Sequence, residues 1–398
     1  MLYLDNSATT PPYPEVVSTV ADVMGKHFGN PSSIHRLGME AERLLHRSRK
    51  VIAETLSCKS QEIIFTASGS ESNNLAIKGA VYRYQNRGKH LITSEIEHAS
   101  VYECYQQLKG QGFEITFLPV DQTGSIRLDD LAHALREDTI LVSLMYVNNE
   151  VGRIQPIEEA GRMLQDYPRV LFHVDAIQAY GKLDCSAGRL GADLLSVSAH
   201  KYRGPKGAGF LYCREGIELV PLIAGGGQEQ GIRSGTENVP LLVGMAKASR
   251  MATEEIIVAT PRLYQLRQLL IKQLQSIEGL TITGSSNPVD MAPHIVHFVL
   301  SGIRSEVMVH ALEEAQIYIS ARSACASGAI SPSRVLLAMG KRREEATNGL
   351  RVSLSAQQTE AEIQLFIKEL CKAVARLRRP DISSKERILW SHKPLLLD

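Results

Sequence analysis

A lysine-containing tetrapeptide follows one of the β-rich runs of the chain. Ser198-Ala199-His200-Lys201 stands at the end of the run DLLSVSA, and the β-rich run before it, VLFHVDA, carries Asp175 near its end. In open α/β sheets, ligands bind outside the carboxyl ends of the strands. We therefore expect an amine and a carboxylate to meet at one ligand site.

The amine of Lys201 and the carboxylate of Asp175 are the two groups that the cofactor pyridoxal 5′-phosphate (PLP) requires. The amine forms a covalent Schiff base, and the carboxylate keeps the pyridine nitrogen protonated so that the ring can accept electrons. An ordinary Asp–Lys ion pair is the alternative, but it would not account for the hydroxyl of Ser198 and the imidazole of His200 beside the lysine. The pattern favours a PLP enzyme.

A phosphate site is expected at residues 66–71, TASGSE, which join a β-rich run to a helical pattern. Small residues there let main-chain N–H groups at the helix N-terminus approach an anion. Taken alone, Ser70 would be interpreted as a helix cap, but together with the lysine and the aspartate it favours phosphate binding. His98, in SEIEHAS, stands where it could stack on a cofactor ring, although a lone histidine is more often structural.

The elements that must hold these residues alternate along the chain from about residue 60 to residue 215. Several β-rich runs are apolar on both faces, as strands of a buried parallel sheet are. Repeated βα units predict an α/β domain with a mainly parallel seven-stranded sheet and helices on both faces. The runs are 62–67, 90–96, 114–120, 139–147, 170–176, 193–199 and 207–213, and helices are expected at 72–85, 100–109, 128–135 and 157–165.

The rest of the chain predicts a second, smaller domain. An amphipathic helical stripe precedes the βα units, and helical patterns continue to about residue 277. From Leu280 onward, short β-rich runs and helical patterns mix, which indicates an α+β domain. We therefore predict a large PLP-binding domain at 15–260 and a small domain made of 1–14 and 261–398. The tail after Pro380 fits no element.

Composition narrows the functional classes. The chain has 398 residues, of which 44% are hydrophobic and 22% charged, as in ordinary soluble globular proteins. A formal net charge of +1 and the absence of long apolar runs give no reason to expect a nucleic-acid or membrane partner. No secretion signal is visible, and the six cysteines form no CxxC pair. We expect a cytoplasmic protein with reduced thiols and no metal site.

A series of motifs in a fixed order covers nearly the whole chain. It reads YLDNSATTPP, FGNPSS, FTASGSESNN, EIEH, NNEVG, FHVDAIQAYGK, SAHKYRGPKG, GGGQEQGIRSGTEN, RSACAS and LRVSLS. In these motifs the chain resembles the cysteine desulfurases of the NifS/IscS type, members of the class V aminotransferase group within PLP fold type I. The resemblance implies a homodimer that removes sulfur from L-cysteine, giving L-alanine and a persulfide for an acceptor protein.

The resemblance also implies a role for each motif residue. It makes Lys201 the Schiff-base lysine and Asp175 the partner of the pyridine nitrogen. His98 is implied to stack on the ring and to take part in catalysis, and Gln178 to contact the ring hydroxyl. The implied phosphate-binding residues are Gly69, Ser70, Ser198, His200 and, from a second subunit, Thr236. Asn149 is implied to bind both cofactor and substrate, and Arg351 to bind the substrate. Arg351 also suits a substrate carboxylate on chemical grounds, because a guanidinium binds it through two hydrogen bonds; a surface salt bridge is the alternative.

Cys325 decides which reaction is expected. It stands in RSACASG, a run of small and polar residues that indicates a loop, where a thiol is available as a nucleophile. By resemblance it accepts the sulfur. Arg322 departs from the family, which usually has glycine there, so we expect either a stiffer loop or a charge presented to a partner. TASGSES replaces the common TSGATES, but Ser70 keeps a hydroxyl, so PLP binding is expected to survive.

Other reactions and classes stay open at this point. A selenocysteine lyase would share every step except the attacked atom, and an aminotransferase would share the fold but not the need for Cys325. A binding or scaffolding homologue without activity is opposed by the presence of all the implied catalytic residues. A nicotinamide dehydrogenase is opposed by the lack of GxGxxG after the first β-rich run. The acceptor protein, in iron–sulfur cluster assembly or tRNA thiolation, is not indicated.

Overall fold

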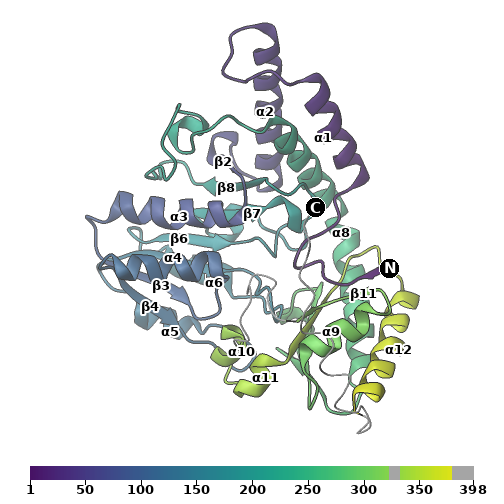
Figure 1. Cartoon of the computed structure of the whole chain (residues 1–398). Coiled ribbons are helices and arrows are strands. Elements are labelled where there is room, and N and C mark those ends of the chain that lie inside the picture. The colour runs from purple at the N-terminus through teal and green to yellow at the C-terminus, as the bar shows by residue number, and fades with distance from the viewer. Residues whose placement is uncertain (322–331, 379–398) are drawn as a thin grey trace, which may run out of the picture.

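A seven-stranded sheet forms the centre of the larger part of the molecule (Figure 1), as seen in a computed structural model that describes residues 1–321 and 332–378. The strand order is β2-β8-β7-β6-β5-β3-β4. Neighbours from β7 to β4 are parallel, and β8 is antiparallel to both β7 and β2. The predicted mainly parallel seven-stranded sheet is confirmed. The strands are β2 (Ile63–Thr66), β3 (His90–Ser94), β4 (Glu114–Leu118), β5 (Thr139–Met145), β6 (Leu171–Asp175), β7 (Leu194–Ser198) and β8 (Gly209–Cys213).

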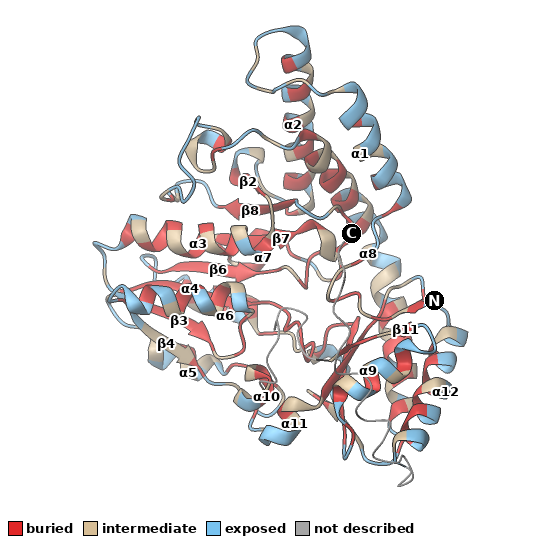
Figure 2. Cartoon of the chain, viewed as in Figure 1, coloured by how far each residue is buried: buried red, intermediate tan, exposed pale blue. Residues whose placement is uncertain are grey.

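Helices cover both faces of this sheet, and the four crossover helices expected from the sequence are present. One hydrophobic cluster packs α3 and α4 on one face, and another packs α1, α2, α6, α7 and the first part of α8 on the other. Figure 2 shows the strands buried and the outer helix surfaces exposed. The helices are α1 (Pro14–Lys26), α2 (Arg36–Thr55), α3 (Gly69–Tyr84), α4 (Ala99–Gly110), α5 (Leu128–Ala134), α6 (Ile157–Leu164), α7 (Ala187–Leu190) and α8 (Val239–Leu274).

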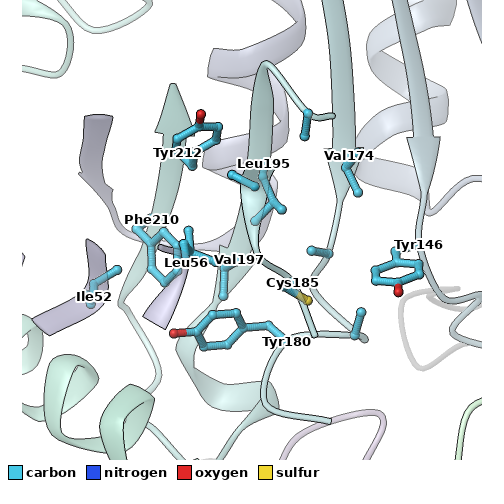
Figure 3. Packing of buried hydrophobic residues seen from close by; sticks show 14 of the residues in the cluster. Ile52, Leu56, Tyr146, Val174, Tyr180, Cys185, Leu195, Val197, Phe210 and Tyr212 are labelled. Carbon is cyan, nitrogen blue, oxygen red and sulfur yellow. The ribbon is translucent and has the colours of Figure 1, made fainter. Parts of the chain in front are cut away.

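The larger cluster is built from alternate residues of the strands and from aromatic side chains (Figure 3). Val197 on β7 and Phe210 on β8 point to the same face, next to Tyr180. The rings of Tyr180 and Phe210 meet edge to face, with centroids 5.5 Å apart. Burying each such side chain stabilises the fold by roughly 1.5–3 kcal/mol. This packing fixes the strand whose end carries Lys201.

A smaller α+β unit follows, in agreement with the predicted fold class. Its four-stranded antiparallel sheet has the order β12-β13-β10-β9, and the first strand of the chain, β1, pairs in parallel with β11. The elements are β1 (Leu2–Tyr3), β9 (Leu280–Thr283), β10 (Ile295–Leu300), β11 (Ile317–Tyr318), β12 (Ser320–Ala321), β13 (Gly349–Ser353), α9 (Ser305–Glu313), α10 (Arg334–Ala338), α11 (Arg343–Thr347) and α12 (Glu360–Leu377).

One helix runs through both units. The 36-residue α8 contains Pro261 and continues across residue 260, where the sequence places a domain boundary. Its residues up to Ala252 belong to the core of the large unit, and those from Leu263 belong to the core of the small one. The exact domain limits stay predictions. Within the described ranges, no helix is long and apolar enough to span a membrane.

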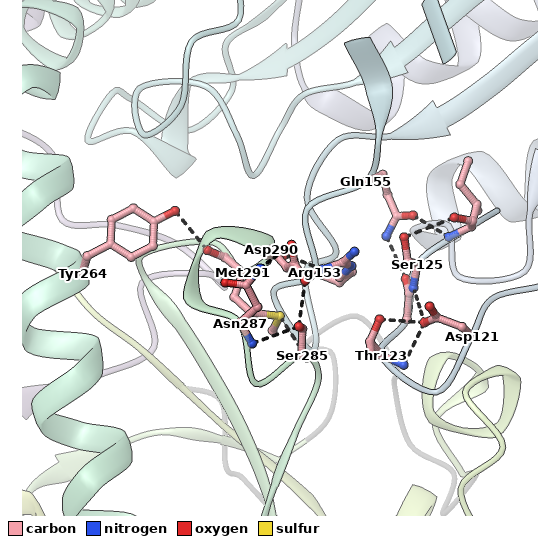
Figure 4. Close-up of polar contacts among 12 residues, drawn as sticks. Asp121, Thr123, Ser125, Arg153, Gln155, Tyr264, Ser285, Asn287, Asp290 and Met291 are labelled. Carbon is pink, nitrogen blue, oxygen red and sulfur yellow. Dashed lines mark hydrogen bonds and ion pairs between the residues drawn. The ribbon is translucent and has the colours of Figure 1, made fainter. Parts of the chain in front are cut away.

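A polar contact joins the small unit to the loop after β5 (Figure 4). Arg153 Nη1 lies 2.8 Å from Asp290 Oδ2, and the main-chain N–H of Ile154 donates to the Asp290 carbonyl at 2.9 Å. Although burial opposes it, hydrogen bonds from Ser285 and Arg153 hold the pKa of Asp290 below its usual value. The loop that carries Asn149 is therefore fixed against the small unit.

Candidate active site

A cavity of about 170 Å³ lies at the carboxyl edge of the large sheet. It brings together nearly all the site residues expected from the sequence. Thr236 is an exception, because it lies elsewhere. Cys325 and Arg322 lie outside the described residues. The expected residues that line it are Gly69, Ser70, His98, Asn149, Asp175, Gln178, Ser198, His200, Lys201 and Arg351, and the lining is completed by Ser7, Ala8, Ser68, Ser100, Met145, Val147 and Ile177.

Strand register explains why segments so far apart in sequence meet here. Met145 on β5 pairs with Asp175 on β6, and Asp175 pairs with Ser196 on β7. Thr66 on β2 and Ser198 on β7 both pair with Gly209 of the strand between them. The carboxyl ends of these strands therefore lie at one edge, and the residues that follow them surround a single space.

Lys201 is held by the N-terminal segment of the chain. It lies in a short 3₁₀ turn, Ala199–Lys201, directly after β7. Its Nζ donates to the carbonyl oxygens of Ser7 at 2.6 Å and Ala8 at 2.7 Å. Gln178 Nε2 donates to the same Ser7 oxygen at 2.9 Å. The motif containing residues 7 and 8 was part of the family resemblance, but the sequence alone assigned these two residues no role.

A buried lysine, Lys182, supports the turn that carries Lys201. Lys182 Nζ donates to the Lys201 carbonyl at 2.9 Å. Burial, assisted by the charge of Lys201, lowers the pKa of Lys182 to about 7. Burial likewise lowers the pKa of His200 to about 4, so its ring is neutral beside Lys201. Sequence reasoning did not identify Lys182, because nothing in GKLD distinguishes a buried lysine from a solvated one.

Asp175 offers a buried carboxylate to the cavity. Its Oδ2 accepts a hydrogen bond from Asn73 Nδ2 at 2.8 Å, and its Oδ1 accepts one from the Ile177 N–H at 3.0 Å. Burial raises the pKa of Asp175, while the nearby His98 and the two hydrogen bonds oppose that rise. A carboxylate held in this way can fix a proton on a basic nitrogen placed against it.

The N-terminus of α3 opens onto the same cavity. Ser68 caps the helix, since its Oγ accepts from the Glu71 N–H at 3.1 Å. The alternative interpretation, in which Ser70 is the cap, is therefore wrong, and the exposed hydroxyl of Ser70 is left for a ligand. A Cβ on Gly69 would lie 2.3 Å from Ile177 Cδ1 and 3.1 Å from Ser198 Cβ, so a larger residue here would force the Ile177 side chain to move. The helix end suits an anion.

Arg351 reaches the cavity from β13 of the small unit. Only 2% of it is exposed, so the alternative of a surface salt bridge is wrong. Its Nη1 donates to the Asn149 carbonyl at 2.7 Å, and its Nη2 donates to Asp5 Oδ1 at 2.8 Å. Its Nε is buried and has no partner. A buried donor left unpaired destabilises a fold, so this N–H is a candidate partner for an anionic group.

Thr236 lies away from this cavity. Its side chain is exposed and lines a separate cavity of about 250 Å³ together with Phe65 and Glu229. Within one chain it does not meet Lys201. The role implied for it, binding phosphate in a second subunit, stays a prediction.

The described cysteines are not placed to react in the cavity. Cys104, Cys185 and Cys213 are buried, Cys58 is half-buried and Cys371 is exposed on α12. Burial raises the pKa of the Cys104 thiol to about 11 and that of Cys213 to about 12, as expected for inert core thiols. None of these five thiols lines the cavity.

Comparisons with known proteins agree with this geometry. The family model Aminotransferase class-V matches residues 2–366. A "NifS/IcsS protein homolog" of Lactobacillus delbrueckii subsp. bulgaricus is 45% identical over 368 residues, 92% of this chain and 95% of the relative. The "Cysteine desulfurase IscS" of Methanosarcina thermophila is 42% identical over 377 residues, 95% of this chain and 93% of the relative.

Solved structures show the same likeness. A "NIFS-LIKE PROTEIN" has a TM-score of 0.88 at 36% identity and covers 94% of this chain and 99% of its own. The structure titled "SspA in complex with cysteine" has a TM-score of 0.78 at 35% identity and covers 90% of this chain and 100% of its own. The matched length, the sheet topology and the convergence of the motif residues on one cavity show that the chain belongs to the aminotransferase class-V family.

Proposed function

We propose that this protein is a PLP-dependent cysteine desulfurase, which converts L-cysteine to L-alanine and leaves the sulfur as a persulfide on Cys325. The observation that carries the proposal is that the Lys201 amine, the Asp175 carboxylate and the Arg351 guanidinium line one cavity. The names of the relatives and the cysteine in the SspA title support the substrate.

The groups around the cavity fit PLP in three places. The N-terminus of α3, with the space that Gly69 leaves and the Ser70 hydroxyl, suits the phosphate. The buried Asp175 carboxylate suits the pyridine nitrogen, and the Lys201 amine suits the aldehyde carbon. Ser7, whose Oγ is buried without a partner, also lines the cavity. When bound, PLP supplies an electron sink for the charge formed at the substrate Cα.

Each of the protein's own residues at the cavity then has a separate role in the reaction. Arg351 binds the substrate carboxylate through its unpartnered Nε, and the Asn149 carbonyl keeps the guanidinium in place. The Lys201 amine takes the proton from the substrate Cα as a general base. His98 lies at the cavity wall as a proton donor or acceptor for the substrate. The small and large units therefore both contribute to binding one amino acid.

Sulfur transfer requires a thiolate as the nucleophile. The Cys325 thiolate attacks the substrate sulfur, so that an S–S bond forms while the Cβ–S bond of the substrate breaks. The electron pair of the broken bond stays with the three-carbon fragment, which is protonated and released as L-alanine. The persulfide on Cys325 holds the sulfur until an acceptor protein takes it. A homodimer, with Thr236 completing the partner's site, is part of the proposal.

Replacing Asp5 with asparagine is expected to tighten binding of amino-acid carboxylates. Asp5 Oδ1 lies 2.8 Å from Arg351 Nη2, so its charge competes with a substrate carboxylate for the same guanidinium. Asparagine keeps the acceptor oxygen but removes the competing charge. We expect the KM for L-cysteine and the inhibition constant of L-alanine to fall by about 3- to 10-fold.

The matched control is an amine without a carboxylate. Cysteamine should inhibit the wild type and Asp5→Asn equally, because it makes no use of Arg351. A higher KM for L-cysteine in Asp5→Asn would show instead that the charge of Asp5 is needed to orient the guanidinium, and would contradict the competition described here.

The assay that tests the proposed function is turnover of L-cysteine by the purified, PLP-loaded protein in the presence of a thiol reductant. A desulfurase releases L-alanine and sulfide in equal amounts. An aminotransferase would form a keto acid and convert the cofactor to its amine form in one half-reaction, and a β-eliminating enzyme would form pyruvate. Formation of a keto acid without alanine would overturn the proposal.

A further inference from the structure

A continuous set of hydrogen bonds joins Asp175 to His98 through the side chains of Asn73 and Ser100. Asn73 Nδ2 lies 2.8 Å from Asp175 Oδ2 and 2.9 Å from Ser100 Oγ, and Ser100 Oγ lies 2.8 Å from His98 Nδ1. Asn73 is fully buried on α3, and Ser100 stands in the first turn of α4, which packs against α3. Helices α3 and α4 thus link Asp175, at the end of β6, to His98, which follows β3.

The chemistry of the Asp175 carboxylate, at one end of this set, determines which atom donates in each hydrogen bond. A carboxylate only accepts hydrogen bonds, so the amide nitrogen of Asn73 must face Asp175; the opposite amide orientation would bring two oxygens together. The second hydrogen on the same nitrogen points to Ser100 Oγ, which therefore accepts. The hydroxyl proton of Ser100 is then left for His98 Nδ1.

His98 receives a second donor at the same ring nitrogen. The main-chain N–H of Ser100 donates to His98 Nδ1 at 3.2 Å, because His98 is the N-cap of α4. With two donors aimed at Nδ1, that nitrogen acts as an acceptor and carries no proton. The neutral ring therefore holds its proton on Nε2.

We propose that Asn73 and Ser100 are positioning residues that hold His98 in the Nε2–H tautomer, so that this ring meets the substrate as a proton donor rather than as a base. Through the same amide, Asn73 holds the Asp175 carboxylate. The effect of the tautomer on catalysis rests on the proposed function, but the tautomer itself is a property of the protein and does not depend on it.

The orientation of Asn73 has no explanation in packing alone. Its Oδ1 is buried without a partner, and an unpaired buried acceptor destabilises a fold. The amide keeps this orientation because both hydrogens on its nitrogen have acceptors, on Asp175 and Ser100. Ser100 in turn has no other acceptor for its hydroxyl proton among the hydrogen bonds of the described residues.

The tautomer is tested directly by NMR of the PLP-loaded protein labelled with ¹⁵N-histidine. The His98→Gln variant identifies the signals of His98 by their loss. We expect the two-bond correlations of a ring protonated on Nε2 at pH 8. A ring protonated on Nδ1, or on both nitrogens, at that pH would overturn the proposal. This measurement needs no turnover, so its result is independent of whether the proposed function is correct.

Kinetics test the role of the two positioning residues. Ser100→Ala should lower kcat for L-cysteine by about tenfold with KM within about twofold, because one hydrogen bond to the ring is lost. Ser100→Thr keeps a hydroxyl and should restore kcat to within about threefold. The matched control is Ser249→Ala, which removes a buried hydroxyl bonded to Tyr202 and should leave kcat unchanged. Equal kcat in Ser100→Ala and the wild type would overturn the proposal.

A double-mutant cycle shows whether Asn73 acts on His98 through Ser100. Asn73→Ala should lower kcat more than Ser100→Ala, because it also releases Asp175, and the double variant should be no slower than Asn73→Ala alone. Strictly additive losses would overturn the coupling. If the wild type forms no L-alanine from L-cysteine, the proposed function fails, whereas the NMR result on His98 still decides the tautomer.

Discussion

Lys201→Ala is expected to lose the visible absorbance of the PLP-loaded protein and to slow L-cysteine turnover by at least about 10⁴-fold, because in the proposed function one amine provides both the cofactor attachment and the general base. Lys201 is the only lysine on the cavity wall among the described residues. Another amine, that of Lys182, is buried and donates to the Lys201 carbonyl. The measurements are the absorption spectrum after PLP addition and the rate of L-alanine formation.

Lys206→Ala is the matched control for this prediction. Lys206 lies five residues further along the same loop, and its side chain is exposed outside the cavity. Its replacement should change neither the spectrum nor the rate. An unchanged visible absorbance in Lys201→Ala would mean that another amine holds the cofactor, and the assignment of the site would be wrong.

The second large effect is expected from Cys325→Ala. Without the thiol, the substrate sulfur has no nucleophile, and L-alanine and sulfide formation should fall by at least about 10³-fold. The five described cysteines cannot replace it, since none lines the cavity and the three buried ones are inert. The spectral change on adding L-cysteine should persist, because Lys201 and Arg351 are untouched. Product formation is measured by amino-acid analysis and a sulfide assay.

Cys371→Ala is the control that shows whether the loss of activity is specific to Cys325 or follows the loss of any thiol. Cys371 is exposed on α12 and does not line the cavity. Its replacement should leave the rate unchanged. Desulfuration at the wild-type rate by Cys325→Ala would show that sulfur leaves the substrate without a protein persulfide.

The fold and most of the site could be predicted because both depend on local pattern. Apolar β-rich runs that alternate with helical patterns leave few arrangements other than a parallel sheet, and the ends of such strands meet at one edge. Asp175 ends a strand, and His98 and Lys201 each come soon after one, so their proximity required only the strand order. Arg351 was identified from the resemblance and from the chemistry of carboxylate binding.

Contacts that join distant segments could not be predicted. Asp5 binds Arg351 across 346 residues, and Ser7 holds Lys201 across 194 residues. Neither contact leaves a periodic signal in the sequence. Ser68 rather than Ser70 caps α3 because the helix begins at Gly69, three residues before the start expected from the sequence at residue 72. In the sequence, Asn73 cannot be told from any other polar helix residue. Its role depends on contacts with a neighbouring helix and a strand, which the sequence does not show.

The closure of the site by residues 5–8 also sets the order of events during synthesis. The main-chain and side-chain groups of this segment bond to Ser353, Arg351 and Lys201, so their partners emerge from the ribosome more than 190 and more than 340 residues later. At about 5–20 residues per second, the segment waits on the order of tens of seconds. The βα units can form in that interval, whereas the contacts that fix residues 5–8 to Arg351 and Ser353 form only after β13 has been made.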